Sequence, residues 1–182
     1  GGCDGPAISP SVLSLKKSLQ ASLQGGGGPA GYLVVPNPID ATGNRQAMAS
    51  SPNVENFAKG FSLPSLLAPS RLENGFVKIR IHDVNDDAST LASPDSQGRF
   101  AFDLTDVHYS ETMAYYSILA EMAYLEGLGF SFVKSRPLFV LVRAKTDDGK
   151  EEPNAFYDHN YLNPGAPRMM RLFGSGDFAP GI

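Results

Sequence analysis

Cysteine is almost absent from this sequence and tryptophan is absent altogether, because the 182 residues contain one Cys and no Trp. A single Cys excludes an internal disulfide and any zinc site built from several cysteines. The histidines are His82, His108 and His159, and none of them belongs to a His-Glu-x-x-His motif. The chain also lacks the Gly-x-Ser-x-Gly turn of serine hydrolases and a phosphate-binding loop. We therefore expect structural histidines and no catalysis by this chain alone.

Charged residues are scarce, at 19%, and the net charge of -4 gives no basic surface for nucleic acid. Long hydrophobic runs are lacking as well. The longest, Pro-Leu-Phe-Val-Leu-Val at 137–142, has the length of a strand, whereas a membrane span needs about 20 apolar residues. With 42% hydrophobic residues the composition is globular. The sequence predicts no nucleic-acid partner and no membrane span.

Glycine and proline are abundant, with 19 and 14 residues, and they indicate many turns. Residues 1–30 are predicted to be a flexible tether, because Gly25-Gly-Gly-Gly28 precedes Pro29. The tether includes a possible short helix, in which apolar residues recur at intervals of three to four. These residues are Val12, Leu15, Leu19 and Leu23. The remainder, residues 31–182, is predicted to be a single α+β domain.

The only cysteine, Cys3, follows Gly1 and Gly2 at the start of the chain. This arrangement resembles the end of a bacterial lipoprotein signal, in which the Cys becomes the acylated first residue. Such an anchor would place the protein outside the cytoplasm and would be its only contact with a membrane. The alternative is an incidental exposed thiol.

The first half of the domain is expected to be rich in β-strands. Strands are predicted at 32–35, at 76–81 and at 99–103, and the last two are expected to form a hairpin with a long loop. In 76–81 the alternation of residues predicts that Val77 and Ile79 face the core. The Pro-, Ser- and Asn-rich stretch 40–75 is expected to be irregular.

A long helix is predicted from about Asp106 to Leu125, where neither Gly nor Pro occurs. Asp106 or Thr105 is expected to cap its start, and Gly127 to provide the left-handed residue at its end. Its apolar residues cover most of its circumference, which predicts burial between layers. Strands are expected to follow at 138–143, 154–158 and 168–173. The predicted fold is α+β: a β-rich N-terminal part, one long buried helix, and then a small mixed or antiparallel sheet.

One acidic cluster offers oxygen ligands directly after a predicted strand. Its members are Asp83, Asn85, Asp86 and Asp87. Alternating oxygen ligands suit a hard cation such as calcium, although the Gly and the distal Glu of an EF-hand are missing. The alternative is that these are solvated acids of a turn.

Three segments in the later part of the chain resemble thermolysin and fungalysin peptidases. Asp106-Val-His-Tyr109, together with 125–130, is similar to the family's long first helix. Asn154-Ala-Phe-Tyr157 is similar to its Asn-Ala-Phe-aromatic edge strand, and 168–176 to the next strand and its glycine turn. The order of the segments is that of the family, so the resemblance implies the N-terminal lobe of a metallopeptidase.

The resemblance implies a role for the predicted edge strand. In the family, the Asn side chain and the Ala carbonyl bind the backbone of an extended peptide, which adds an antiparallel strand to the sheet. Carried over, the substrate-binding residues are Asn154, Ala155, Phe156 and Tyr157. The alternative is that Asn154 ends a turn while Phe156 and Tyr157 are core aromatics.

The family's zinc ligands and general-base Glu follow the position at which this chain stops, Ile182. The resemblance therefore implies a non-catalytic scaffold whose partner is a missing C-terminal, zinc-binding half. The parent would be a secreted or envelope zinc metalloendopeptidase, and this chain would be a truncated part of it or a degenerate homologue. No cofactor is expected in the chain itself, apart from the possible calcium.

A different reading is a non-enzymatic, β-rich surface lipoprotein or binding module. Residues 76–104 carry a strand, an acidic loop and a second strand, a pattern typical of β-sandwich repeats on surface proteins. The segment 106–126 distinguishes the two readings, because a small β-sandwich has no place for a buried helix of this length.

Overall fold

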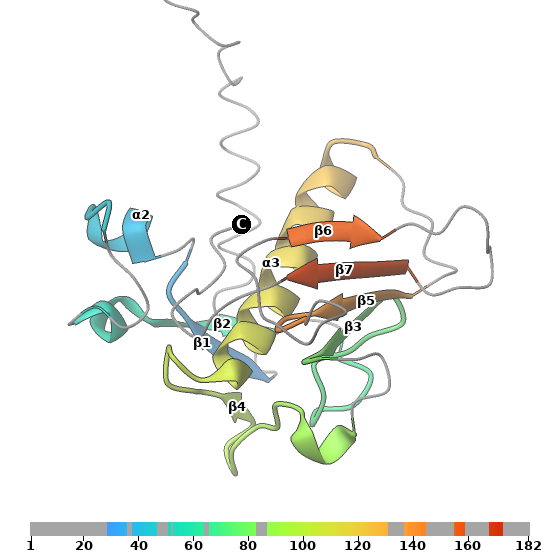
Figure 1. The fold of residues 1–182 in the computed structure, drawn as a ribbon, viewed down its shortest axis with the longest axis horizontal. Helices are drawn as coiled ribbons and strands as arrows, with labels where there is room; N and C mark the ends of the chain where they lie inside the picture. The colour runs from blue at the N-terminus through green and yellow to red at the C-terminus, as the bar shows by residue number, and fades with distance from the viewer. Residues whose placement is uncertain are drawn as a thin grey trace, which may run out of the picture.

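The computed structural model describes residues 29–35, 38–46, 51, 53–63, 66–82, 87–130, 137–144, 155–158 and 168–172. These residues form an α+β fold with one long helix and two small sheets, as Figure 1 shows. The elements are β1 (Ala30–Leu33), α2 (Pro38–Thr42), η1 (Val54–Phe57), β2 (Lys59–Ser62), β3 (Val77–Arg80), η2 (Ala88–Thr90), β4 (Arg99–Phe100), α3 (Val107–Gly127), β5 (Leu138–Leu141), β6 (Ala155–Asp158) and β7 (Arg168–Leu172). The predicted α+β class is confirmed at this level. The predicted tether lies outside the described residues, apart from its last two.

The strands of the described residues divide into two sheets. One has the order β2-β1-β4, with β1 antiparallel to β2 and parallel to β4. The other has the order β3-β5-β7-β6, in which β3, β5 and β7 are parallel and β6 is antiparallel to β7. The strands that follow the helix therefore form a mixed sheet, which β3 from the first half of the chain completes.

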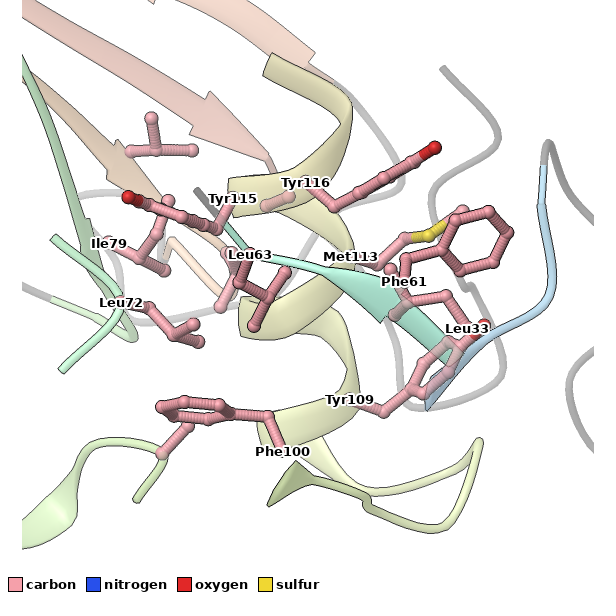
Figure 2. Close-up of a cluster of buried hydrophobic side chains, with 14 of the residues drawn as sticks. Leu33, Phe61, Leu63, Leu72, Ile79, Phe100, Tyr109, Met113, Tyr115 and Tyr116 are labelled. Carbon is pink, nitrogen blue, oxygen red and sulfur yellow. The ribbon is translucent and has the colours of Figure 1, made fainter. Parts of the chain in front are cut away.

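The middle of α3 is buried on every side. Every residue from Glu111 to Tyr116 is buried, and the helix contacts β1 of one sheet and β3 of the other. In Figure 2, Tyr109, Met113 and Tyr116 project towards Leu33 and Phe61, whereas Tyr115 projects towards Ile79 and Leu72. The rings of Phe61 and Tyr116 are 4.9 Å apart. A helix that contacts a sheet on either side needs apolar residues around its whole girth, as its sequence has.

The predicted burial of the whole helix is wrong for its second half. From Ser117 onwards every residue is half-buried or exposed. Its 21 residues span about 30 Å. Burial between the two sheets therefore does not extend over the whole helix, and Met122 is only partly buried.

The predicted cap at the start of α3 is confirmed, whereas the predicted left-handed residue at its end is wrong. Asp106, rather than Thr105, caps the start, and its carboxylate accepts a hydrogen bond from the His108 N–H at 2.9 Å. At the other end Gly127 is still helical, and Gly129 is the left-handed residue, with φ of +91°. The N–H of Gly129 donates to the Glu126 carbonyl, and that of Phe130 donates to the Leu125 carbonyl. These bonds satisfy carbonyls that the helix leaves free.

The predicted hairpin of 76–81 with 99–103 is wrong, because β3 and β4 belong to different sheets. β4 is only two residues long and pairs with Ala30 and Gly31 of β1. It is held there by Phe100, whose side chain is fully buried. The stretch 40–75 is also more regular than expected, since it contains η1, β2 and most of α2.

Two tyrosines of α3 provide a matched test of this packing. The Tyr109 hydroxyl accepts a hydrogen bond from the buried N–H of Val34 at 3.0 Å. The Tyr116 hydroxyl is also buried, and within the described residues it has no hydrogen-bond partner. Tyr109→Phe should lower the free energy of unfolding by about 1–3 kcal/mol, because it leaves a buried donor unsatisfied. Tyr116→Phe should cost clearly less in urea unfolding. Equal losses would contradict the bond between α3 and β1.

Candidate functional site

The segment predicted to bind a peptide forms strand β6 at the end of the mixed sheet. Residues 155–158 pair with β7 on one side, in the register Ala155↔Leu172 and Tyr157↔Met170. Within the described residues no strand pairs with the other side, and Figure 1 shows β6 as the outermost arrow of this sheet. Asn154 lies outside the described residues. A strand with one unpaired edge presents N–H and C=O groups that another extended chain can use.

Side chains in β6 alternate between the two faces of the sheet. Tyr157 therefore shares a face with Ala155, and the Tyr157 side chain is 49% exposed. This exposure shows that Tyr157 is not a core aromatic, which was one of the two interpretations of the segment. The side chain of Phe156 lies outside the described part of the chain.

The acidic cluster proposed for calcium is described only at Asp87, since Asp83, Asn85 and Asp86 lie outside the described residues. The Asp87 carboxylate caps η2 and accepts a hydrogen bond from the Ser89 N–H at 2.8 Å. This backbone bond, together with the Ser89 side chain, lowers the pKa of Asp87. In the described ranges no three His, Cys, Asp or Glu residues come together in a group that could hold a metal ion. Cys3 also lies outside these ranges.

A pair of polar residues at the start of α3, His108 and Glu111, was not predicted from the sequence. The Glu111 side chain is buried, at 1% exposure, and its Oε1 lies 2.6 Å from Nδ1 of His108. The N–H of Ala92 donates to both carboxylate oxygens, at 3.2 Å and 3.0 Å. The signal in the sequence is the separation of three residues, which places His108 and Glu111 on one side of a helix.

The pair connects a buried carboxyl group with a partly exposed imidazole. The His108 side chain is 29% exposed, and its ring packs against Phe102 with centroids 5.2 Å apart. Burial raises the pKa of Glu111, although the hydrogen bonds from His108 and Ala92 oppose the shift. The nearby carboxylate of Asp106 raises the pKa further. The arrangement therefore places a buried carboxyl group of raised pKa in contact with an imidazole ring that reaches the surface.

A third polar residue of α3, Tyr115, faces the other sheet. It forms a hydrogen bond with the side chain of Asn74, whose oxygen also accepts from the N–H groups of Phe76 and Val77. Burial raises the pKa of Tyr115 to about 12. The phenol is therefore protonated at neutral pH, and its role is to connect the helix with the start of β3.

Comparison of the chain with protein-family models, with curated proteins and with solved structures found no match. Among the helices that the structure describes, none combines the length and the hydropathy needed to cross a membrane.

The raised pKa of Glu111 predicts the direction of one pH effect. The folded chain holds this proton more tightly than the unfolded chain, whose Glu has the ordinary pKa. The resulting stability is fully present below that ordinary value and is lost as the pH rises through the folded pKa. Measured by urea unfolding, the wild type should lose stability relative to Glu111→Gln as the pH rises from 4 to neutrality. Glu121→Gln, which alters an exposed carboxylate of the same helix, should follow the wild type. Parallel curves for Glu111→Gln and the wild type would contradict the raised pKa.

Proposed function

We propose that this chain is the scaffold and substrate-edge-strand portion of a thermolysin/fungalysin-like metalloendopeptidase, the part that precedes the zinc-binding helix. The observation that carries the proposal is the place of β6. The Ala-Phe-Tyr of the Asn154–Tyr157 segment lies in the last strand of the mixed sheet, antiparallel to β7. The family resemblance requires an edge strand here, with the next strand of the chain as its neighbour.

In this proposal the edge of β6 that faces away from β7 receives an extended peptide as an added antiparallel strand. The carbonyl of Ala155 and the side chain of Asn154 bind the peptide backbone, and the exposed Tyr157 contacts its side chains. Backbone pairing gives affinity with little selectivity for sequence, because every peptide carries the same N–H and C=O groups. The contribution of this chain is therefore to bind and orient the substrate.

The chemistry belongs to a segment outside these 182 residues. The family's zinc, when bound, polarises the scissile carbonyl and activates a water molecule. In the described part of the chain no three His, Cys, Asp or Glu side chains form a group that could hold a metal ion. The proposal also places the protein outside the cytoplasm, with Cys3 as a lipid anchor.

The position of α3 argues against the alternative that this chain is a binding module with a β-sandwich fold. Helix α3 contacts strands of both sheets, and its residues from Glu111 to Tyr116 are buried. A small β-sandwich packs its two sheets directly on each other, so it would leave no room for this helix. A non-enzymatic envelope lipoprotein of another fold is the outcome that remains if the peptidase test fails.

The test uses the product of the complete reading frame that contains these residues. We expect a His-Glu-x-x-His motif after Ile182 and zinc-dependent cleavage of casein, with the isolated 182-residue chain inactive. Asn154→Ala should lower kcat/KM by about 5- to 150-fold, which corresponds to the loss of one buried hydrogen bond of about 1–3 kcal/mol. Its unfolding free energy should change little.

Asn56→Ala provides the matched control, because Asn56 is an exposed amide residue far from β6 in sequence, in η1. It should leave kcat/KM unchanged. A reading frame without the motif, or a full-length product without metal-dependent hydrolysis, would overturn the proposal. Full activity of Asn154→Ala would contradict the proposed role of the edge strand in binding the peptide.

A further inference from the structure

An Asn-Gly dipeptide, Asn74-Gly75, lies shortly before β3 and is the only one in the sequence. Glycine has no Cβ, so the backbone nitrogen that follows an Asn is least hindered when it belongs to Gly. This nitrogen can attack the side-chain carbonyl of the Asn, a reaction that underlies the chemical lability of Asn on heating. Gly75 is exposed, and a Cβ there would meet nothing within 4 Å. The backbone half of the reacting pair is therefore open to water.

The Asn74 side chain, in contrast, is held in place. The residue is only 8% exposed, and its Oδ1 accepts hydrogen bonds from the N–H groups of Phe76 at 2.8 Å and Val77 at 2.7 Å. The Asn74 N–H donates to the Val77 carbonyl at 2.8 Å, which restrains the backbone of the same residue. Tyr115, which projects from α3 towards this side of the core in Figure 2, forms a further hydrogen bond with the Asn74 side chain.

Deamidation requires the Asn74 side chain to leave this position. The reaction closes a five-membered ring from the Gly75 nitrogen and four carbons of Asn74: Cγ, Cβ, Cα and the carbonyl carbon. In such a ring Cγ nearly eclipses the carbonyl carbon about the Cα–Cβ bond, whereas a side chain normally occupies a staggered rotamer, about 60° or more away. Ring closure therefore needs a rotation that displaces Oδ1 from the N–H groups of Phe76 and Val77.

We propose that Asn74-Gly75 is a deamidation site, which the hydrogen bonds of Asn74 keep closed in the folded chain and which opens when the contact with Tyr115 is lost. In the open form the Gly75 nitrogen forms a bond to Cγ of Asn74. The bond from Cγ to Nδ2 breaks, and the leaving nitrogen takes the proton of the Gly75 N–H and departs as ammonia. Water then opens the ring at one of its two carbonyls and leaves an aspartyl or isoaspartyl residue at position 74. The inference is independent of the proposed peptidase role.

The two products differ in their effect on the fold. An aspartyl residue keeps an oxygen that can accept from Phe76 and Val77, whereas an isoaspartyl residue inserts a methylene group into the main chain and shifts these N–H groups. Because β3 begins at Val77 and is the strand of the mixed sheet that contacts α3, the isoaspartyl product loosens the sheet from the helix. Once separated, the isoaspartyl form should unfold at a lower urea concentration than the unmodified chain, and an equal midpoint would contradict this consequence.

Mass spectrometry of the incubated and digested 182-residue chain measures the conversion of Asn74. The folded wild type should convert more slowly than the same chain unfolded in urea. Tyr115→Phe removes one hydrogen bond from the Asn74 side chain and keeps the aromatic ring. In the folded state it should convert about 2- to 10-fold faster than the wild type, the equivalent of one hydrogen bond.

Three variants separate local opening from a general loss of stability. Tyr116→Phe removes the neighbouring hydroxyl, which has no hydrogen-bond partner among the described residues, and should convert at the wild-type rate. Tyr109→Phe weakens the fold through a bond to Val34 instead, so it should accelerate conversion clearly less than Tyr115→Phe does. Gly75→Ala, whose methyl group has room, should convert more slowly than the wild type in both the folded and the unfolded state.

Four results would overturn the proposal. They are conversion of the folded wild type as fast as in urea, no conversion in urea, a wild-type rate for Tyr115→Phe, and equal acceleration by Tyr109→Phe and Tyr115→Phe. The last of these would show that Asn74 reacts only when the whole chain unfolds. If Tyr115→Phe does not fold, the comparison of the folded wild type with the chain in urea decides the matter.

Discussion

The burial of α3 on every side from Glu111 to Tyr116 is the constraint on which the rest of the structure depends. A helix between two sheets brings its polar side chains into the core as well, and each must find a partner there. Tyr109 accepts from Val34 next to β1, Glu111 from Ala92, and Tyr115 bonds with Asn74 beside β3. These three bonds connect one helix with three separate segments of the chain, so α3 is both the centre of the core and the point at which the segments are aligned.

The same arrangement separates the core from the places where function is proposed. The mixed sheet begins at β3, which contacts α3, and continues through β5 and β7 to β6. The strand proposed to bind a peptide is therefore the one farthest from the helix in the order of the sheet.

Features that depend on neighbouring residues could be predicted from the sequence, and those that depend on distant pairing could not. The absence of Gly and Pro from a long stretch rich in apolar residues located α3, and Asp106 was among the two expected caps. The assignment of β3 and β4 to one hairpin failed because strand pairing is non-local: β4 instead pairs with β1, which is distant in the sequence, through two residues only. β2 reads Lys-Gly-Phe-Ser, which has no alternation to detect. The pairing of His108 and Glu111 had a local signal in their spacing, but its burial depends on Ala92, which is 19 residues away from Glu111.

The contact between α3 and the three-stranded sheet can be tested most directly at Gly31 of β1. A Cβ at this position would lie 2.8 Å from Cγ2 of Thr112 and 3.2 Å from Cδ2 of Leu63. Thr112 is fully buried and stiff at χ1, so it cannot easily yield. Gly31→Ala should therefore lower the free energy of unfolding by about 1–3 kcal/mol. Gly75→Ala, whose Cβ would meet nothing within 4 Å, should change it by less than about 0.5 kcal/mol. Equal stabilities for the two variants would show that α3 does not pack against β1 as described.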